Sequence, residues 1–264
     1  MLKGAMHMHS TCSDGEFTLP ELREIFFADG CSFACVTDHA EYFDDASIQR
    51  YVEQCQSLSD NKFVFVAGLE YRCESNMHIL GYGATQLTPA TDPQAVIRHI
   101  NSQNAVSVIA HPKDDSFAWI ESFETLPLGI EAWNTKYDGR YAPRPGTFAL
   151  LQRLRQRQPA TLAFFGQDLH WKKQYRGMFV ELDCALPKAE AILRALQSGS
   201  YFGQKDNYRL PSSGIIADEL LAEFGRDHDR SNRLWRIMKG SKQVLDRAGI
   251  KVPASIKAQL RRIF

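Results

Sequence analysis

The chain has 264 residues, 44% of them apolar, with 31 basic and 31 acidic side chains. This composition is typical of a globular protein and gives no sign of intrinsic disorder. No apolar run reaches the roughly 18 residues that a membrane span needs, and no secretory signal is evident at the start. The six cysteines are scattered without a CxxC pair, which favours reduced thiols. We therefore expect a cytoplasmic protein with no membrane partner.

The charge is unevenly distributed along the chain. From Gly225 to the end there are 11 Lys and Arg against 3 Asp, a surplus of +8, so residues 1–224 carry −8. One interpretation is a basic helical tail that lies on an acidic body. The other is a tail that meets an anionic partner such as nucleic acid. The zero total argues against strong non-specific DNA binding by the whole protein.

Segments typical of strands and helices alternate along most of the chain. Residues 3–9 (KGAMHMH) are expected to form a strand. Residues 18–30 are expected to form a helix, with a capping box of Thr18 and Glu21, Pro20 in the first turn and Gly30 as its end. Further strands are expected at 31–39, 62–70, 76–83, 105–112, 128–134, 161–170 and 177–183, and helices near 45–59, 92–104, 146–158 and 187–199.

This alternation predicts the fold class. Strands that alternate with helices over some 200 residues favour an α/β fold with a parallel sheet, and a closed barrel is its natural large version. After residue 187 the chain is expected to be mainly helical. We therefore predict one domain over residues 1–264, with a basic helical extension from about residue 217.

Side chains that can bind metals recur where the expected strands end. These positions are His7 and His9, Asp38 and His39, Glu70, His78 within its strand, His111, Asn134, and Asp168 with His170. Residues i and i+2 of a strand point to the same face, so His7 and His9 project together. A parallel barrel gathers the C-terminal ends of its strands on one face. Six of the eight histidines, with Asp14, Glu70 and Asp168, are therefore expected to converge and bind metal.

In sequence order these residues form the motifs HxHxxxxD, TDH, GxE, a strand histidine, HP and DxH. The series resembles the PHP family, the polymerase and histidinol phosphatase superfamily of metal-dependent phosphoesterases, over residues 7–170. HSTCSDG and TDH look most like the small stand-alone members that act on nucleotides and short oligonucleotides. The resemblance implies a distorted (β/α)7 TIM-like barrel with two or three divalent metal ions, Zn, Mn or Fe, at the strand ends.

Carried over motif by motif, the resemblance implies three groups of ligands. They are His7, His9, Asp168 and Glu70 for the first metal; Glu70, His78 and His111 for the second; and Asp14, His39 and His170 for the third. Some family members have histidine in place of Asp14, which leaves the occupancy and identity of the third metal open. Asp38 is expected either to accept a hydrogen bond from a ligand imidazole or to stabilise the turn.

The function implied is that of a metal-dependent phosphoric ester hydrolase, in which metal-bound hydroxide attacks the ester. The substrate would be a small phosphomonoester such as a nucleotide, or short oligonucleotides. The alternatives are a histidinol-phosphate phosphatase and a catalytically weak PHP binding module. The sequence contains neither a GxSxG elbow nor a phosphate-binding GxxxxGK[ST] loop. No obligate protein partner is inferred.

Several polar side chains near the expected rim are candidates to contact the substrate. The predicted contacts are Lys113, Asn134, Arg140 and Arg144, with Lys136, Lys172 and Lys173 as further cations. A guanidinium matches phosphate bidentately, whereas a solvated loop charge is the alternative for each cation. Three aromatic residues, Tyr137, Tyr141 and Trp171, are expected either to stack on a base or to cover the barrel mouth.

Overall fold

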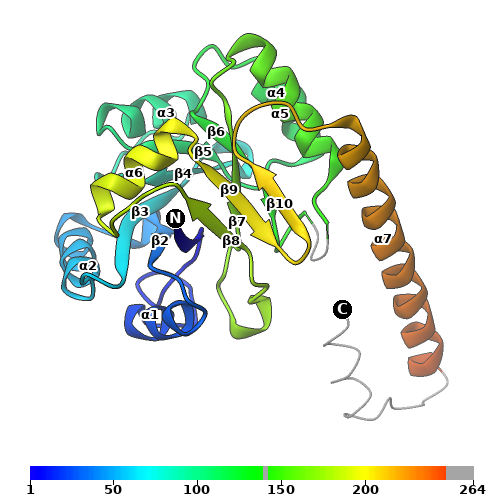
Figure 1. Cartoon of the computed structure of the whole chain (residues 1–264), viewed down its shortest axis with the longest axis horizontal. Coiled ribbons are helices and arrows are strands. Elements are labelled where there is room, and N and C mark those ends of the chain that lie inside the picture. Colours follow the sequence, from blue (N-terminus) through cyan, green and yellow to red (C-terminus); the bar gives the residue numbers. More distant parts are fainter. Residues whose placement is uncertain (139–141, 248–264) are drawn as a thin grey trace.

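The computed structural model describes residues 1–138 and 142–247, and a single ten-stranded sheet forms its centre. Seven strands curve into a nearly closed barrel (Figure 1): β1 (Leu2–Met6), β2 (Phe33–His39), β3 (Val64–Arg72), β4 (His78–Tyr82), β5 (Val106–Ile109), β6 (Gly129–Asn134) and β7 (Leu162–Gly166). The residues after β1 meet those after β7, where His9 N donates to Leu169 O at 2.9 Å and Gln167 N to Met6 O at 3.1 Å. The predicted distorted TIM-like barrel is therefore confirmed.

The structure describes seven helices, the first three of which are capped by the side chains of Thr18, Asp44 and Asp92. They are α1 (Leu19–Ala28), α2 (Asp45–Ser57), α3 (Pro93–Ser102), α4 (Phe117–Glu121), α5 (Pro145–Arg157), α6 (Ala189–Ser198) and α7 (Asp218–Arg247). Before α1, Thr18 Oγ1 accepts from Glu21 N while the Glu21 carboxylate accepts from Thr18 N, so the predicted capping box is present. Short 3-10 turns lie at Ala40–Tyr42, Glu74–Asn76, Asp114–Ser116 and Lys172–Gln174.

The sheet is mixed, and the prediction of a parallel sheet was wrong in this respect. The strands β1, β2 and β3 run parallel, as do β5, β6 and β7, but β4 is antiparallel to both of its neighbours. The link from β3 to β4 holds only a 3-10 turn, and a parallel pair would need a crossover of a dozen or more residues. Because β4 runs backwards, its first residue, His78, pairs with Arg72 at the end of β3. His78 therefore reaches the same rim as the ends of the parallel strands.

The described chain after residue 187 is mainly helical, as expected, but a hairpin of two strands that was not predicted lies between its two helices. Strands β8 (Phe179–Leu182), β9 (Tyr201–Lys205) and β10 (Tyr208–Pro211) extend the sheet from β1, each antiparallel to the strand before it in the sheet. A two-residue turn joins β9 to β10, with Asp206 at a φ of 51°. Gly203 lets the ring of Phe165 pack against β9, since any Cβ there would overlap that ring.

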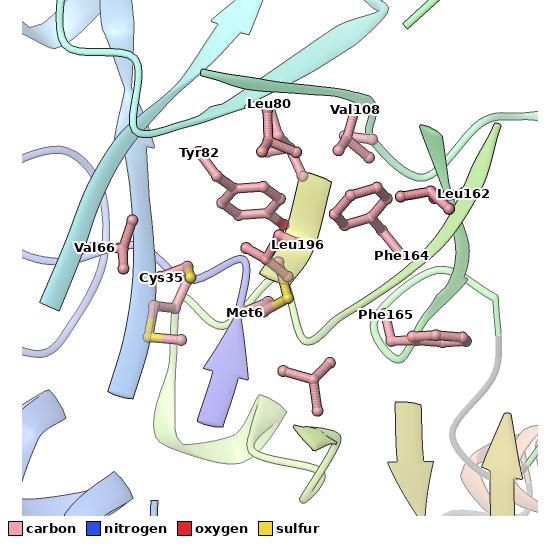
Figure 2. Close-up of a cluster of buried hydrophobic side chains, with 14 of the residues drawn as sticks. Met6, Cys35, Val66, Leu80, Tyr82, Val108, Leu162, Phe164, Phe165 and Leu196 are labelled. Atoms are coloured by element: carbon pink, nitrogen blue, oxygen red, sulfur yellow. The ribbon is translucent and has the colours of Figure 1, made fainter. Parts of the chain in front are cut away.

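The core fills the barrel with apolar side chains from most strands (Figure 2). Tyr82 and Phe164 stack at 6.0 Å between ring centroids, and each side chain of this size contributes about 1.5–3 kcal/mol when fully buried. Helix α6 covers the end of the barrel remote from His78. There Leu193 contacts Gly83 after β4, and Gln197 donates to Asn104 O before β5. The opposite end of the barrel is thus left for the polar rim.

Helix α7 carries the predicted basic extension. Its first turns pack Phe224 against Phe148 of α5 and Tyr208 of β10. The rest of α7 then runs away from the barrel (Figure 1). Within the described ranges, none of the helices combines the length and the apolar character that crossing a membrane requires. Residues 248–264, the remainder of the predicted tail, lie outside the described part of the chain.

Candidate metal centre

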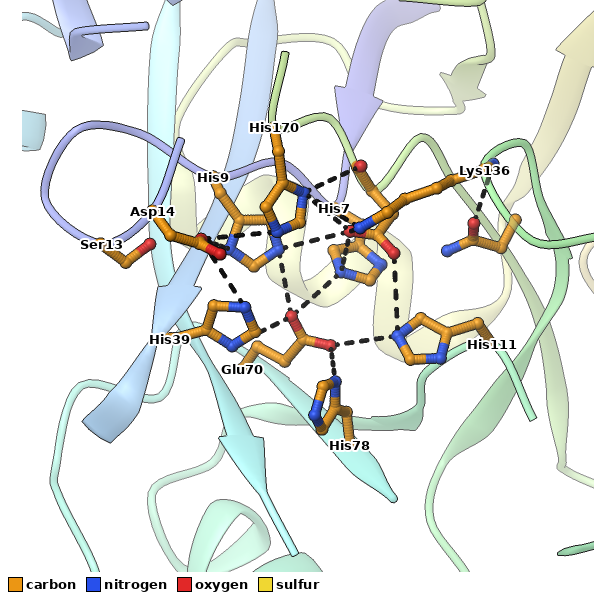
Figure 3. Close-up of polar contacts among 12 residues, drawn as sticks. His7, His9, Ser13, Asp14, His39, Glu70, His78, His111, Lys136 and His170 are labelled. Atoms are coloured by element: carbon orange, nitrogen blue, oxygen red, sulfur yellow. Dashed lines mark hydrogen bonds and ion pairs between the residues drawn. The ribbon is translucent and has the colours of Figure 1, made fainter. Parts of the chain in front are cut away.

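All nine predicted ligands lie together at one end of the barrel, with the buried carboxylate of Glu70 at their centre (Figure 3). Glu70 approaches five histidines. Its Oε2 lies 3.1 Å from His9 Nε2, 3.4 Å from His7 Nε2 and 3.5 Å from His39 Nδ1, and its Oε1 lies 2.9 Å from His78 Nδ1 and 3.3 Å from His111 Nε2. One carboxylate at the end of β3 thus connects ligands from four other parts of the barrel.

The ligand atoms fall into three groups, and within each group they lie within 4.8 Å of one another. The groups are His7, His9 and Asp168; His7, Glu70 and His111; and His9, Asp14, His39 and His170. These groups overlap with the three ligand sets implied by the sequence motifs but differ in detail: the first lacks Glu70, the second has His7 in place of His78, and the third also has His9. Asp14 is 37% and His39 12% exposed, whereas no side chain of the other two groups exceeds 7%, so the third group lies nearest to solvent.

The residues present fit the divalent metals that the sequence resemblance implies. Both ring nitrogens of His9, Nδ1 of His39 and Oδ2 of Asp168 are buried, and none has a hydrogen-bond partner within the described ranges. Folded proteins rarely leave buried polar atoms in this state without a reason such as an ion. Mixed imidazole and carboxylate donors are the set that Zn, Mn and Fe accept.

The electrostatics of the cluster favour the metal-binding forms of His9 and Asp168 but the protonated form of His7. Burial, opposed by the pull of Glu70, lowers the pKa of His9 to about 4, so its imidazole is neutral at pH 7. Burial would raise the pKa of Asp168, but the neighbouring His7 and His170 hold it well below its usual range. Burial would lower the pKa of His7, yet Glu131, Asp168 and Glu70 together hold it well above 6.5. A metal ion bound to His7 would therefore have to displace a proton from its ring.

Three of the ligands have strained backbones. His7, His111 and Asp168 have φ values of 57°, 28° and 49°, a region that residues other than glycine seldom adopt. Each such residue costs of order 1–3 kcal/mol and persists only when its surroundings enforce it. All three follow directly or closely after strands β1, β5 and β7. Three strand ends that carry ligands therefore hold a strained residue.

Asp38 stabilises a turn, which is one of the two roles considered from the sequence. Its carboxylate accepts hydrogen bonds from Ser10 N at 2.8 Å, Ser10 Oγ at 2.8 Å and Ser13 Oγ at 2.6 Å. These contacts fix the loop that carries Asp14. Asp14 Oδ1 in turn lies 3.4 Å from His170 Nε2 and 3.7 Å from His39 Nε2.

Glu131 of β6 is a site residue that the sequence analysis missed. The side chain is fully buried behind His7, and its Oε1 accepts from His7 Nδ1 at 2.7 Å. Its Oε2 accepts from His111 N and from Asn134 Nδ2, both at 2.9 Å. The available signal was a lone carboxylate inside the otherwise apolar run GIEAW, because a buried charge needs partners.

The predicted substrate contacts occupy different surroundings. Asn134 is fully buried, with its amide bound to Glu131, and Arg144 pairs with Asp138 Oδ1 at 2.7 Å and donates to Pro112 O at 2.6 Å. Both therefore hold the loop after β6 in place. Lys136 faces the cluster, with Nζ 3.1 Å from Asp168 Oδ1 and 3.3 Å from His170 Nδ1. Lys113 lines the cavities described next. Arg140 and Tyr141 lie outside the described residues.

Two cavities adjoin the cluster. One, of about 480 Å³, is lined by residues that include Asn76, His78, His111, Lys113 and Trp119. The other, of about 350 Å³, lies among residues that include Asp14, His39, Tyr42, His111 and Tyr137. The side chains of the cluster can therefore be reached from solvent.

Three exposed aromatic rings each contact a histidine of the cluster. The ring centroids of Tyr42 and His39 are 6.2 Å apart, those of Tyr137 and His111 4.6 Å, and those of Trp171 and His170 5.5 Å. The three aromatic side chains are between 43% and 55% exposed. We call Tyr42, Tyr137 and Trp171 the aromatic rim.

Comparison with known proteins agrees with this geometry. No protein-family model matches the chain. A two-domain protein from Bacteroides vulgatus, described as containing a predicted PHP-like metal-dependent phosphoesterase, superposes with a TM-score of 0.58 at 20% identity, over 85% of this chain and 69% of that chain. This chain has the PHP-like fold. The resemblance found in the motifs is thus confirmed at the level of the fold.

Two weaker similarities accompany this one. A candidate metal-dependent phosphoesterase from Bifidobacterium adolescentis superposes with a TM-score of 0.49 at 15% identity, over 74% of this chain and 96% of that chain. The DNA polymerase/3'-5' exonuclease PolX of Bacillus subtilis is 41% identical over 46 residues, which are 17% of this chain and 8% of that protein. The chain thus matches only a small part of this curated relative's length.

Proposed function

We propose that this chain is a metal-dependent phosphoesterase. The observation that carries the proposal is the cluster at the barrel rim, where Glu70 lies within 3.5 Å of five histidine rings. Divalent ions bound there would neutralise the charge that develops on the phosphoryl and leaving oxygens and would activate water. The PHP-like fold of the chain supports the same reaction class.

Cationic side chains of the chain would bind and orient the phosphoryl group at this site. Burial would lower the pKa of Lys136, but Asp168 holds it above its usual range, so its ammonium stays charged beside the cluster. We propose that Lys136 Nζ contacts a non-bridging phosphoryl oxygen, with Lys113 as a second cation at the cavity wall. Arg144 would act indirectly, by tying the loop after β6 to Pro112 next to His111.

We propose nucleotides or short oligonucleotides as the substrates. The aromatic rim supports this choice, because it surrounds the cluster with three separate exposed rings. Bases stack on such rings regardless of sequence. Histidinol phosphate, the main alternative, carries a single small ring and would use at most one of these positions.

Removal of one ring of the aromatic rim should weaken the binding of substrates that carry bases. Tyr137→Ala and Trp171→Ala should each raise KM for a dinucleotide by roughly 10-fold, because one base stack is worth about 1–3 kcal/mol. Steady-state kinetics should show no such change with glycerol phosphate, which has no ring. Phe27→Ala is the matched control, since Phe27 is an exposed ring on α1 outside the rim. Equal effects on both substrates would contradict the stacking role.

A panel assay tests the function itself. Phosphate or nucleotide release would be measured from nucleoside mono- and bisphosphates, histidinol phosphate and short oligonucleotides, with Mn and Zn supplied separately. We expect turnover that disappears in His7→Ala, and the best substrate would define the subclass. Full metal loading without turnover on any substrate would overturn the phosphoesterase and favour a PHP barrel that only binds a partner.

We also propose a cytoplasmic location. All six cysteines lie in the described part of the chain and are free thiols, four of them buried. A reducing compartment keeps cysteines in this form. Burial raises the pKa of Cys35 well above its usual range, so this thiol is protected from reaction by its position in the core.

A further inference from the structure

We propose that Glu131 sets the tautomer of His7, so that the Nε2 lone pair of His7 points at the metal cluster. Glu131 would be a positioning residue, acting on the metals only through His7. The inference rests on the proposed metal-dependent function for its biological meaning, but its test does not depend on catalysis.

The two ring nitrogens of His7 face different surroundings. Nδ1 lies 2.7 Å from Glu131 Oε1, on the side away from the rim, and Nε2 faces Glu70 Oε2 at 3.4 Å and Asp168 Oδ1 at 3.7 Å. A carboxylate offers only acceptors, so the Nδ1 of His7 must carry the proton that it donates. In the neutral ring Nε2 is then an unprotonated donor of electrons, which is the form that binds metal.

The partners of the other oxygen of Glu131 determine which atom is the donor in the hydrogen bond between His7 and Glu131. Oε2 accepts from the backbone N–H of His111, which can only donate, and from Asn134 Nδ2. The Asn134 amide cannot turn over, because its Oδ1 accepts from Lys136 N at 3.0 Å and Tyr137 N at 3.1 Å. Oε2 of residue 131 must therefore be an acceptor, and the carboxylate then presents its other acceptor, Oε1, to His7 Nδ1.

Glutamine at position 131 cannot meet this requirement. Its single oxygen would satisfy the two fixed donors, His111 N and Asn134 Nδ2, and its NH₂ would then face His7 Nδ1. His7 would accept there and carry its proton on Nε2, where the metal should bind. The alternative rotamer would set the NH₂ against two donors, so either arrangement weakens metal binding.

The neighbouring strand confirms that this space is built for the carboxylate. A Cβ at Gly166 of β7 would overlap Glu131 Oε1 and lie 2.8 Å from His7 Cβ. Glycine at this position allows the carboxylate and the imidazole to meet between β6 and β7. Glu131, His7 and the backbone of β7 are thus packed closely together.

The test compares Glu131→Gln with the wild type in two measurements. Calorimetric titration of metal-free protein with Zn or Mn should give a 10- to 100-fold weaker affinity in the variant. Nitrogen NMR of ¹⁵N-histidine protein at alkaline pH, where the ring is neutral, should show His7 protonated on Nδ1 in the wild type and on Nε2 in the variant. Glu181→Gln, on β8 and paired with Arg209, is the matched control.

The outcomes separate this inference from the proposed function. Wild-type protein with His7 protonated on Nε2 would overturn the inference without any variant, and so would a Glu131→Gln protein with unchanged metal affinity. His7→Ala combined with Glu131→Gln should bind metal no more weakly than His7→Ala alone, because Glu131 acts through His7; a further 10-fold loss would overturn that route. Absence of phosphatase activity in the wild type would sink only the proposed function.

Discussion

Glu70→Gln is expected to remove more than one metal ion and to lower kcat by at least about 10³-fold, since metal ions supply several kcal/mol of charge stabilisation and each 1.36 kcal/mol is a factor of ten. The reason is the position of Glu70, which lies within 3.5 Å of histidines from all three ligand groups. Metal content of purified protein by mass spectrometry, together with kcat on the best substrate, would measure the effect.

Asp14→Asn provides the contrast for this experiment. Asp14 belongs to one ligand group only and is partly exposed, so its loss should affect one metal ion and leave the other two sites filled. Circular dichroism would establish that both variants are folded. A Glu70→Gln protein that keeps its full metal complement would contradict the central position given to this carboxylate.

Chelation is expected to lower the melting temperature by roughly 5–10 °C. A ligand present at 100 times its Kd stabilises a folded protein by about 2.7 kcal/mol, and 1 kcal/mol shifts Tm by about 2–4 °C in a protein of this size class. Buried atoms of His9, His39 and Asp168 lack hydrogen bonds, which destabilises the folded protein. Coordination to a metal ion would offset this desolvation cost.

Differential scanning fluorimetry with and without EDTA would measure this shift. Returning Mn or Zn in excess should restore the original Tm, and Glu70→Gln should show a much smaller response to the chelator. A Tm that stays constant while metal is shown to leave would mean that the cluster contributes nothing to stability.

The sequence predicted the fold and the composition of the cluster for different physical reasons. Alternating strands and helices identified the barrel, and motifs such as TDH placed histidines at strand ends. His78 was expected in a strand of a parallel sheet, but it reaches the rim because β4 runs in the opposite direction. A short β3–β4 link could have revealed this reversal, since it has no room for a crossover helix.

The features that the sequence analysis did not predict share one cause. A local sequence pattern does not identify a partner that lies far away in the chain. Glu131 is visible as a charge in an apolar strand, but its partner His7 lies 124 residues earlier in the chain. Contacts of the same kind were not foreseen for Arg144, whose guanidinium binds Asp138 and the carbonyl of Pro112. The hairpin β9–β10 is short, and its strands are specified mainly by packing on β8 and Phe165.

The closure of the barrel has a consequence for the lifetime of the protein. Its first and last strands are joined beside the ligands, where Leu169 N donates to His7 O at 3.3 Å and His9 N to Leu169 O at 2.9 Å. Contacts between such remote parts of a chain pay a large loop-closure entropy and tend to form late in folding. Interactions absent from the folding transition state act mainly on the unfolding rate. A bound metal ion would then cross-link the two ends of the barrel and slow its unfolding. In a cell short of metal, the protein would be lost because it unfolds faster, not because it folds more slowly.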